Sequence, residues 1–114
     1  MIWKKICCAV DFSEPSWLAM EQAADLARQL RAELTLVHVR VPPPPAASDV
    51  LVASRGVAAA EAQEREETLE VWRADAQARA GLPVRARVLL GDPATEVGRF
   101  ARDEDCDVLV VGTH

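Results

Sequence analysis

The sequence predicts an α/β fold built on an open, doubly wound parallel sheet, and three observations support this prediction. Short apolar runs alternate with amphipathic helical stretches along the 114 residues. Two of those runs are apolar throughout, as strands covered on both faces are. The alternation gives the order β-α-β-α-β-α-β, which implies right-handed crossovers and helices on both faces of the sheet. We expect the strand order 3-2-1-4.

The first half of the chain predicts two strands and one helix. Residues 6–10 are a continuous apolar run, typical of a buried strand. Ser13 is a suitable N-cap and Pro15 is tolerated in a first helical turn, which together predict a helix over about residues 14–31. Residues 34–41 are rich in β-branched side chains and predict the second strand.

The middle of the chain predicts a loop followed by a long helix. Four consecutive prolines follow the second strand and end it, because proline cannot join a strand ladder or a helix interior. Residues 42–55 are therefore predicted to form a mobile crossover loop. The Ala- and Glu-rich stretch 57–80 predicts a helix that ends at Gly81, with Pro83 just beyond it.

The third predicted strand, residues 84–90, begins with strict alternation of polar and apolar side chains. Arg85 and Arg87 lie on one face of it, and this pattern places the strand at an edge of the sheet. Asp92 and Pro93 then form an N-cap followed by proline at the first helical position, which predicts the start of a third helix.

Two of the predicted strands end at residues suited to a ligand. Residues 107–111 predict a fourth, fully buried strand, and Gly112, Thr113 and His114 follow it. Asp11 follows the first strand. Because the ligands of open parallel sheets bind beyond the carboxyl ends of the strands, we expect a binding site where these two strands end.

Composition and charge exclude several classes of partner. The net charge is −5, and the 13 Lys and Arg residues are scattered rather than clustered, which argues against nucleic-acid binding. No apolar run approaches the ~20 residues of a membrane span, and the N-terminus has no secretory signal. We therefore expect one cytoplasmic domain over residues 1–114, with no membrane association.

The cysteines are interpreted as small buried hydrophobic residues. They are Cys7, Cys8 and Cys106, an odd number without a secretion signal, which argues against a disulfide framework. Neighbouring strand residues point to opposite faces, so Cys7 and Cys8 cannot share one metal ion.

Four segments in the correct order resemble the universal stress protein family. They are residues 5–13, the strand 34–39, the turn 91–93 and the segment 106–114. The resemblance implies that family's fold. The family's nucleotide-binding signature starts at the position of Gly112, and only its first three residues are present here. We therefore expect a C-terminally incomplete domain with the fifth strand missing.

The resemblance also implies a nucleotide site. Asp11 would face the ribose hydroxyls, with helix capping alone as the alternative role. Ala9 and Val39 would wall an adenine slot, with ordinary strand core as the alternative. The predicted contact set is Ala9, Val10, Asp11, Val39, Val111, Gly112, Thr113 and His114.

The function expected from the resemblance is a regulatory module that binds ATP or AMP, with or without Mg²⁺, in the stress response. The alternative is a nucleotide-independent scaffold that acts as a homodimer, and a third is a slow ATP hydrolase. No Walker A loop, Gly-x-Gly-x-x-Gly run, zinc spacing or Gly-x-Ser-x-Gly elbow occurs in the sequence. Binding is therefore favoured over catalysis.

Overall fold

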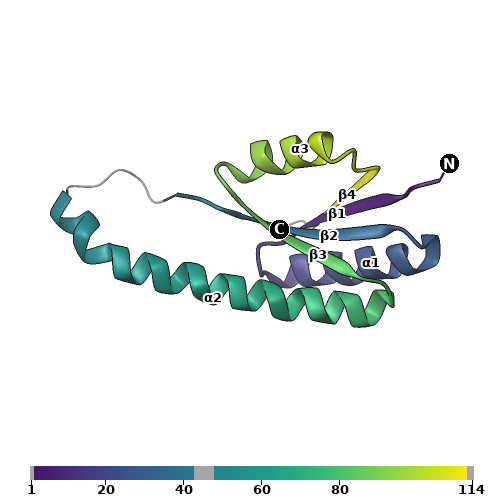
Figure 1. The fold of residues 1–114 in the computed structure, drawn as a ribbon, viewed down its shortest axis with the longest axis horizontal. Helices are drawn as coiled ribbons and strands as arrows, with labels where there is room; N and C mark the ends of the chain where they lie inside the picture. The colour runs from purple at the N-terminus through teal and green to yellow at the C-terminus, as the bar shows by residue number, and fades with distance from the viewer. Residues whose placement is uncertain (1, 43–47, 113–114) are drawn as a thin grey trace.

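The sheet has four parallel strands in the order β3-β2-β1-β4, as predicted (Figure 1). The structure is a computed structural model that describes residues 2–42 and 48–112. Thr113 and His114 of the predicted site lie outside the described residues. The strands are β1 (Lys5–Ala9), β2 (Glu33–Arg40), β3 (Val84–Leu90) and β4 (Val108–Val111).

Two helices cover one face of the sheet and the third covers the other. α1 (Glu14–Leu30) and α2 (Ser48–Ala80) lie on the same side, and α3 (Pro93–Asp103) lies opposite them (Figure 1). The strand order explains this arrangement. The first two crossovers run from β1 toward β3, whereas the crossover through α3 runs back to β4. Right-handed connections in opposite directions place their helices on opposite faces.

α1 begins as predicted because its first turn is capped. The Ser13 hydroxyl accepts a hydrogen bond from the backbone N–H of Ser16 at 3.3 Å, and proline occupies the first turn. The helix ends at Arg31, which adopts left-handed geometry. Alanines dominate the buried stripe, so the helix can approach the sheet closely. These residues are Ala19, Ala23, Ala24 and Ala27.

α2 begins earlier than the sequence predicts. The helix starts at Ser48, so the loop prediction is wrong for residues 48–55, while residues 43–47 lie outside the described part of the chain. The prolines end β2, but the stretch after them is rich in good helix formers. The amino-terminal part of α2 projects beyond the sheet and lengthens the molecule to 54 × 26 × 24 Å (Figure 1).

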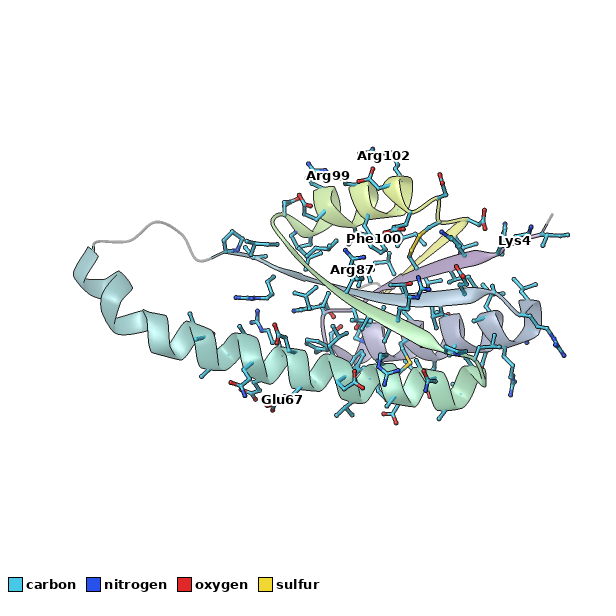
Figure 2. The ribbon with its side chains drawn as sticks, in the orientation of Figure 1. Lys4, Glu67, Arg87, Arg99, Phe100 and Arg102 are labelled. Atoms are coloured by element: carbon cyan, nitrogen blue, oxygen red, sulfur yellow. A yellow bond between two sulfur atoms is a disulfide. The ribbon has the colours of Figure 1, made fainter. Side chains whose placement is uncertain are left out.

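α3 packs over the centre of its face and leaves the edges partly open. The guanidinium of Arg87, on β3, lies 5.5 Å from the centre of the Phe100 ring, on α3 (Figure 2). β3 is an edge strand, as predicted. The prediction that the fourth strand is fully buried is wrong, because Leu109 and Val111 are 39% and 55% exposed. A helix of 11 residues is too short to cover the whole of this face.

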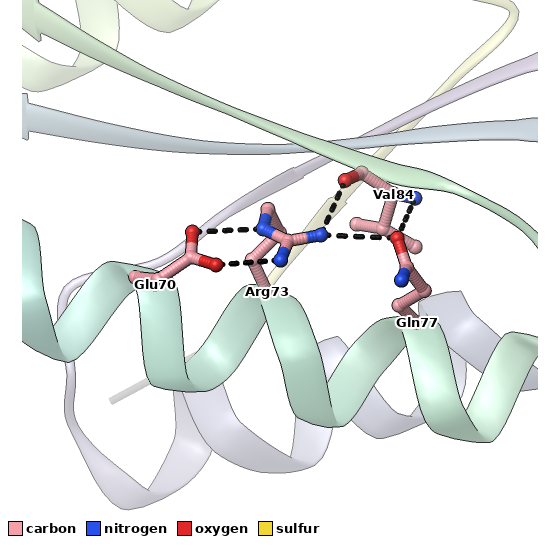
Figure 3. A network of polar contacts seen from close by, with 4 residues as sticks. All are labelled: Glu70, Arg73, Gln77 and Val84. Atoms are coloured by element: carbon pink, nitrogen blue, oxygen red, sulfur yellow. Dashed lines mark hydrogen bonds and ion pairs between the residues drawn. The ribbon is translucent and has the colours of Figure 1, made fainter.

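Polar contacts anchor the carboxyl-terminal part of α2 to the start of β3 (Figure 3). Arg73 donates to the Val84 carbonyl at 3.2 Å, and the amide oxygen of Gln77 accepts from the Val84 N–H at 3.1 Å. Glu70 pairs with Arg73 and orients its guanidinium. Below this network, Leu69 and Trp72 reach the core.

None of the described helices has the length and apolar character needed to cross a bilayer.

The sheet separates two cores of unequal size. Cys8 belongs to the large core beneath α1 and α2, whereas Cys7 belongs to a small one with Val37, Val97 and Phe100 beneath α3. Cys8 is a buried free thiol, as predicted, and burial raises its pKa to about 12. The prediction is wrong for the other two cysteines, because Cys7 forms a disulfide with Cys106. Parallel pairing of β1 with β4 brings together residues that are 99 positions apart.

Candidate functional site

A hollow of about 500 Å³ lies at the carboxyl ends of β1, β2 and β4, between the sheet and α3. This is the end of the sheet at which open α/β folds bind ligands. Its volume is within the range of small-molecule sites. All the predicted site residues that the structure describes line it, and they are Ala9, Val10, Asp11, Val39, Val111 and Gly112.

The floor of the hollow is apolar because alternate residues of the three strands face α3. Ala9 is in register with Val37 on one side and with Val111 on the other, so these three residues form one row. Val39 and Leu109 complete the floor. The small side chain in the middle of the row leaves room above the sheet, and the surface produced is one on which a planar apolar group can lie.

α3 provides a wall that the sequence analysis did not identify. Pro93, Ala94, Val97 and Gly98 line the hollow from the first half of the helix. A Cβ placed on Gly98 would meet no atom within 4 Å, so the space beside this residue is open. The sequence did hold a signal for this wall. Two small residues, Ala94 and Gly98, are four positions apart and therefore lie on one face of the helix. From the sequence, Pro93 predicts only the start of the helix.

Asp11 forms the polar rim of the hollow together with the start of α1. Its Oδ1 accepts hydrogen bonds from the N–H of Ser13, at 3.0 Å, and from the Ser13 hydroxyl. Its own N–H donates to the Ser16 hydroxyl at 3.1 Å. Asp11 therefore holds Ser13, the N-cap residue of α1, and does not itself cap the helix. The side chain is nevertheless exposed and lines the hollow, so the two roles are compatible.

Gly112 is required by packing within the protein itself. A Cβ at this position would lie 2.6 Å from the carbonyl carbon and oxygen of Pro15 and 2.7 Å from the Ser16 nitrogen. The sequence predicts Gly112 as a ligand contact. The structure gives a second reason, because the end of β4 passes directly against the backbone of the first turn of α1.

An aromatic cluster lies behind the site, in the core on the opposite face of the sheet. Phe12 has a positive φ of 65°, and its ring lies 4.5 Å from His38 and 5.2 Å from Trp72, centre to centre. Trp17 packs against Trp72, with the ring centres 4.9 Å apart. His38 is a packed core residue, and its Nδ1 donates to the Val10 carbonyl at 2.9 Å.

The charge around the hollow favours a neutral group over an anionic one. Asp11 is the single charged side chain among the described lining residues. No lysine or arginine is among these lining residues, so none of their side chains could pair with a phosphate. Among the side chains that the structure describes, no group of three His, Cys, Asp or Glu residues could hold a metal ion. The described part therefore offers an apolar slot with one carboxylate at its rim.

Comparison with known proteins identifies the fold. A sequence profile of the Universal stress protein family matches residues 3–114. The universal stress protein UspA from Lactobacillus plantarum is 18% identical and aligns over all of this chain and 81% of its own, with a TM-score of 0.85. No curated protein sequence matches the chain.

Two further solved structures contain adenine nucleotides. The universal stress protein from Archaeoglobus fulgidus in complex with dAMP is 21% identical over 97% of this chain and 82% of that one, with a TM-score of 0.70. A universal stress protein in complex with cAMP is 17% identical over 96% and 71%, with a TM-score of 0.72. At these identities the likeness is one of fold.

Proposed function

Because the chain belongs to the universal stress protein family, we propose that its hollow binds an adenine nucleotide, ATP or AMP, and that the protein acts as a regulatory binding module in the stress response. One observation carries the proposal. An apolar floor, an open helix wall and one carboxylate meet beyond the carboxyl ends of β1 and β4. Fold relatives in complex with dAMP and with cAMP support the choice of an adenine nucleotide.

In the proposed complex the base lies on the floor and the ribose lies at the rim. Ala9 and Val39 contact the adenine, and burial of the aromatic ring supplies most of the favourable free energy. Asp11 accepts hydrogen bonds from the ribose hydroxyls, since a carboxylate has acceptor capacity for several donors. Val10, Val111 and Gly112 border the ligand. Thr113 and His114 remain proposed contacts outside the described residues.

The phosphates are the weakest part of the proposed complex for a polypeptide of residues 1–114. The described lining contains no cation, and one carboxylate would repel a polyphosphate. ATP, with or without Mg²⁺, is therefore expected to bind no more tightly than AMP or adenosine. Slow hydrolysis of ATP is the weaker alternative, and a turnover assay with excess Mg²⁺ tests it.

A second candidate function is a nucleotide-independent homodimeric scaffold in the cytoplasm. It is favoured by the exposed side chains of Leu109 and Val111 on β4, which is an edge strand of the described sheet. Such an edge can pair with another chain. The two functions differ in their dependence on the hollow, so a variant that fills the hollow separates them.

The decisive experiment is calorimetric titration of adenosine, AMP and ATP into the wild type and two pairs of variants. Gly98→Leu adds a side chain to the open wall and should weaken binding of all three ligands by about tenfold or more, since overpacking costs ~1–3 kcal/mol. The same change should not harm folding, because leucine stabilises a helix by ~1 kcal/mol relative to glycine. Gly56→Leu in α2 is the matched control, as its position is equally open and far from the hollow.

Asp11→Ala forms the second pair with Asp75→Ala, an exposed carboxylate on α2. Loss of hydrogen bonds to a charged acceptor, worth ~1.5–3 kcal/mol, should lower the affinity about 10- to 100-fold for Asp11→Ala alone. Thermal unfolding of each variant separates lost binding from lost structure. Tight ATP binding that neither Gly98→Leu nor Asp11→Ala alters would show that the site is elsewhere.

A further inference from the structure

The disulfide between Cys7 and Cys106 joins two parts of the molecule that hold α3. Cys7 lies in β1, an inner strand of the sheet, and Cys106 lies between the end of α3 and the start of β4. Their Cα atoms are 6.3 Å apart, a normal span for a disulfide. The yellow bond lies between the carboxyl-terminal end of α3 and the sheet (Figure 2).

α3 depends on a small number of contacts. Val97 and Phe100 are its buried side chains, and they pack on Cys7 and Val37. The N–H of Cys106 donates to the Ala101 carbonyl at 2.8 Å, so the bridged residue is also tied to the last turn of the helix. The disulfide therefore fastens the carboxyl-terminal end of α3 to the middle of the sheet. The other half of the same helix is the wall of the nucleotide hollow.

The bridge can be reached from solvent. Both cysteines line a surface hollow of about 60 Å³ at the end of the sheet opposite the nucleotide site. Cys7 is buried and Cys106 is half-buried, so an attacking thiolate meets the sulfur of Cys106 first. The greater exposure of Cys106 favours attack there over attack at Cys7, and the rate of exchange through a mixed disulfide depends on such access.

The surroundings of the bridge are charged. The same small hollow is lined by Lys5, Arg85 and Arg87 and by two carboxylates, Glu33 and Glu104. Glu104 is engaged by Arg87, with N and O atoms 3.7 Å apart, and its carbonyl accepts from the Lys5 ammonium at 3.1 Å. Cations and anions thus both lie around the bridge, and the chain neighbours of Cys106, Asp105 and Asp107, are acidic. The thiolate is the form of a cysteine that attacks disulfides.

Cys8 shows what an unreactive cysteine in the same strand looks like. It is adjacent to Cys7 but faces the large core, where burial raises its pKa to about 12. A thiol in that state is almost entirely protonated at neutral pH and does not exchange. Two neighbouring residues of β1 thus differ in reactivity because they lie on opposite faces of the sheet.

We propose that Cys7 and Cys106 form a reversible thiol–disulfide site that exchanges with low-molecular-weight thiols such as glutathione, and that its state sets how firmly α3 is held. In the closing reaction the Cys106 thiolate attacks glutathione disulfide, forming a mixed disulfide and releasing one glutathione thiolate. The Cys7 thiolate then attacks the Cys106 sulfur, closes the bridge and releases the second. The two protons lost by the cysteines are taken up by the two glutathione thiolates, and opening is the reverse.

The first test measures the bridge itself. The protein is equilibrated in buffers with varied ratios of reduced to oxidised glutathione, and the exchange is quenched. The free thiols are then alkylated, and the mass of the protein is measured by mass spectrometry. Wild type and Cys8→Ala should both convert between the bridged form and a form with two additional alkylated cysteines. Cys106→Ala should form no intramolecular bridge at any ratio. A bridge that persists at every ratio, or one that never forms, overturns the proposal.

The second test measures α3 by amide hydrogen exchange. Amides of residues 93–103 should exchange about tenfold faster or more in the reduced protein and in Cys106→Ala, while those of α1 keep their rates. Equal exchange of α3 in both redox states overturns the proposal. A third measurement rests on the proposed function: AMP should bind more weakly to the reduced protein. If AMP binds neither form, the proposed function fails, whereas the exchange result still decides the role of the bridge.

Discussion

Gly112 shows how one residue can satisfy two requirements that the sequence does not separate. It lines the hollow, and its missing Cβ also lets the end of β4 pass against Pro15 and Ser16. The neighbouring atoms are backbone atoms of a capped helix turn, which cannot move aside as a flexible side chain can. We conclude that this glycine serves packing whether or not a ligand is present.

Gly112→Ala should therefore destabilise the protein in the absence of any ligand. The added Cβ would lie 2.6 Å from the Pro15 carbonyl, so strand and helix must separate, at a cost of ~1–3 kcal/mol, the range found for overpacked sites. Urea unfolding measures the change. The control is Gly56→Ala, where the Cβ meets nothing within 4 Å and a helix interior should gain roughly 0.5–1 kcal/mol. Equal stabilities of the two variants would contradict the packing role.

Residue-level prediction from the sequence succeeded where the chemistry is local. The Ser13 cap and the Asp92 cap were both predictable, since each acts within its own helix turn. The Cys7–Cys106 bridge was not, because no local pattern reveals which strands become neighbours. The contact of Asp11 with a ligand stays a prediction.

At the scale of elements, a single carboxylate joins the beginnings of β1 and β4. Asp107 Oδ2 accepts from the backbone N–H of Lys4 at 2.7 Å and of Lys5 at 3.0 Å. These two hydrogen bonds hold the pKa of the Asp107 carboxyl below its ordinary value near 3.8. A carboxyl whose pKa falls on folding stabilises the protein above its ordinary pKa, and this contribution is lost as the pH falls through the folded value.

In the Asp107→Asn variant, the free energy of unfolding should therefore depend less on pH in the acid range than it does in the wild type. The variant should be less stable than the wild type at pH 7, and the difference should shrink as the pH falls below ~4. Urea unfolding between about pH 7 and pH 2 measures both quantities. Asp75→Asn, on the exposed surface of α2, is the matched control for the loss of one carboxylate. Parallel curves for Asp107→Asn and the wild type would show that the contact contributes no pH dependence.

Element boundaries were predictable where a breaker or a cap marks them. β3 (Val84–Leu90) was predicted with its observed bounds, and α3 begins at Pro93 behind its Asp92 cap. The start of α2 was missed because the prolines end a strand without specifying how long the following loop is. The open face of β4 was missed for a different reason. A purely apolar strand predicts burial on both faces, but how far a helix covers it depends on its length and position.

At the scale of the whole molecule, the sheet has an exposed apolar edge. β4 pairs with β1 on one side, and within the described residues no strand pairs with its other side. Leu109 and Val111 on this strand are exposed. Unpaired N–H and C=O groups on an apolar strand favour pairing with another chain.

A polypeptide of residues 1–114 should therefore associate as it is concentrated. Light scattering across a dilution series should show dimers or larger species, and Val111→Lys should shift them toward the monomer, because a charge on an edge strand opposes strand pairing. Val71→Lys is the matched control, since Val71 is 59% exposed on α2, close to the 55% of Val111. A wild type that is monomeric at every concentration would contradict this prediction.

The sequence by itself determined the alternation of strands and helices, because apolar periodicity and capping are encoded in short segments. The resemblance of four ordered segments to one family implied the family, and with it the strand order. Only the tertiary structure decided the rest. It brought Ala9, Val37 and Val111 into one row on the floor of the hollow, passed Gly112 against α1, and joined Cys7 to Cys106. Each of these contacts joins residues from separate elements, often far apart in the chain. Their distances depend on how helices and strands pack, and a local pattern carries no information about that.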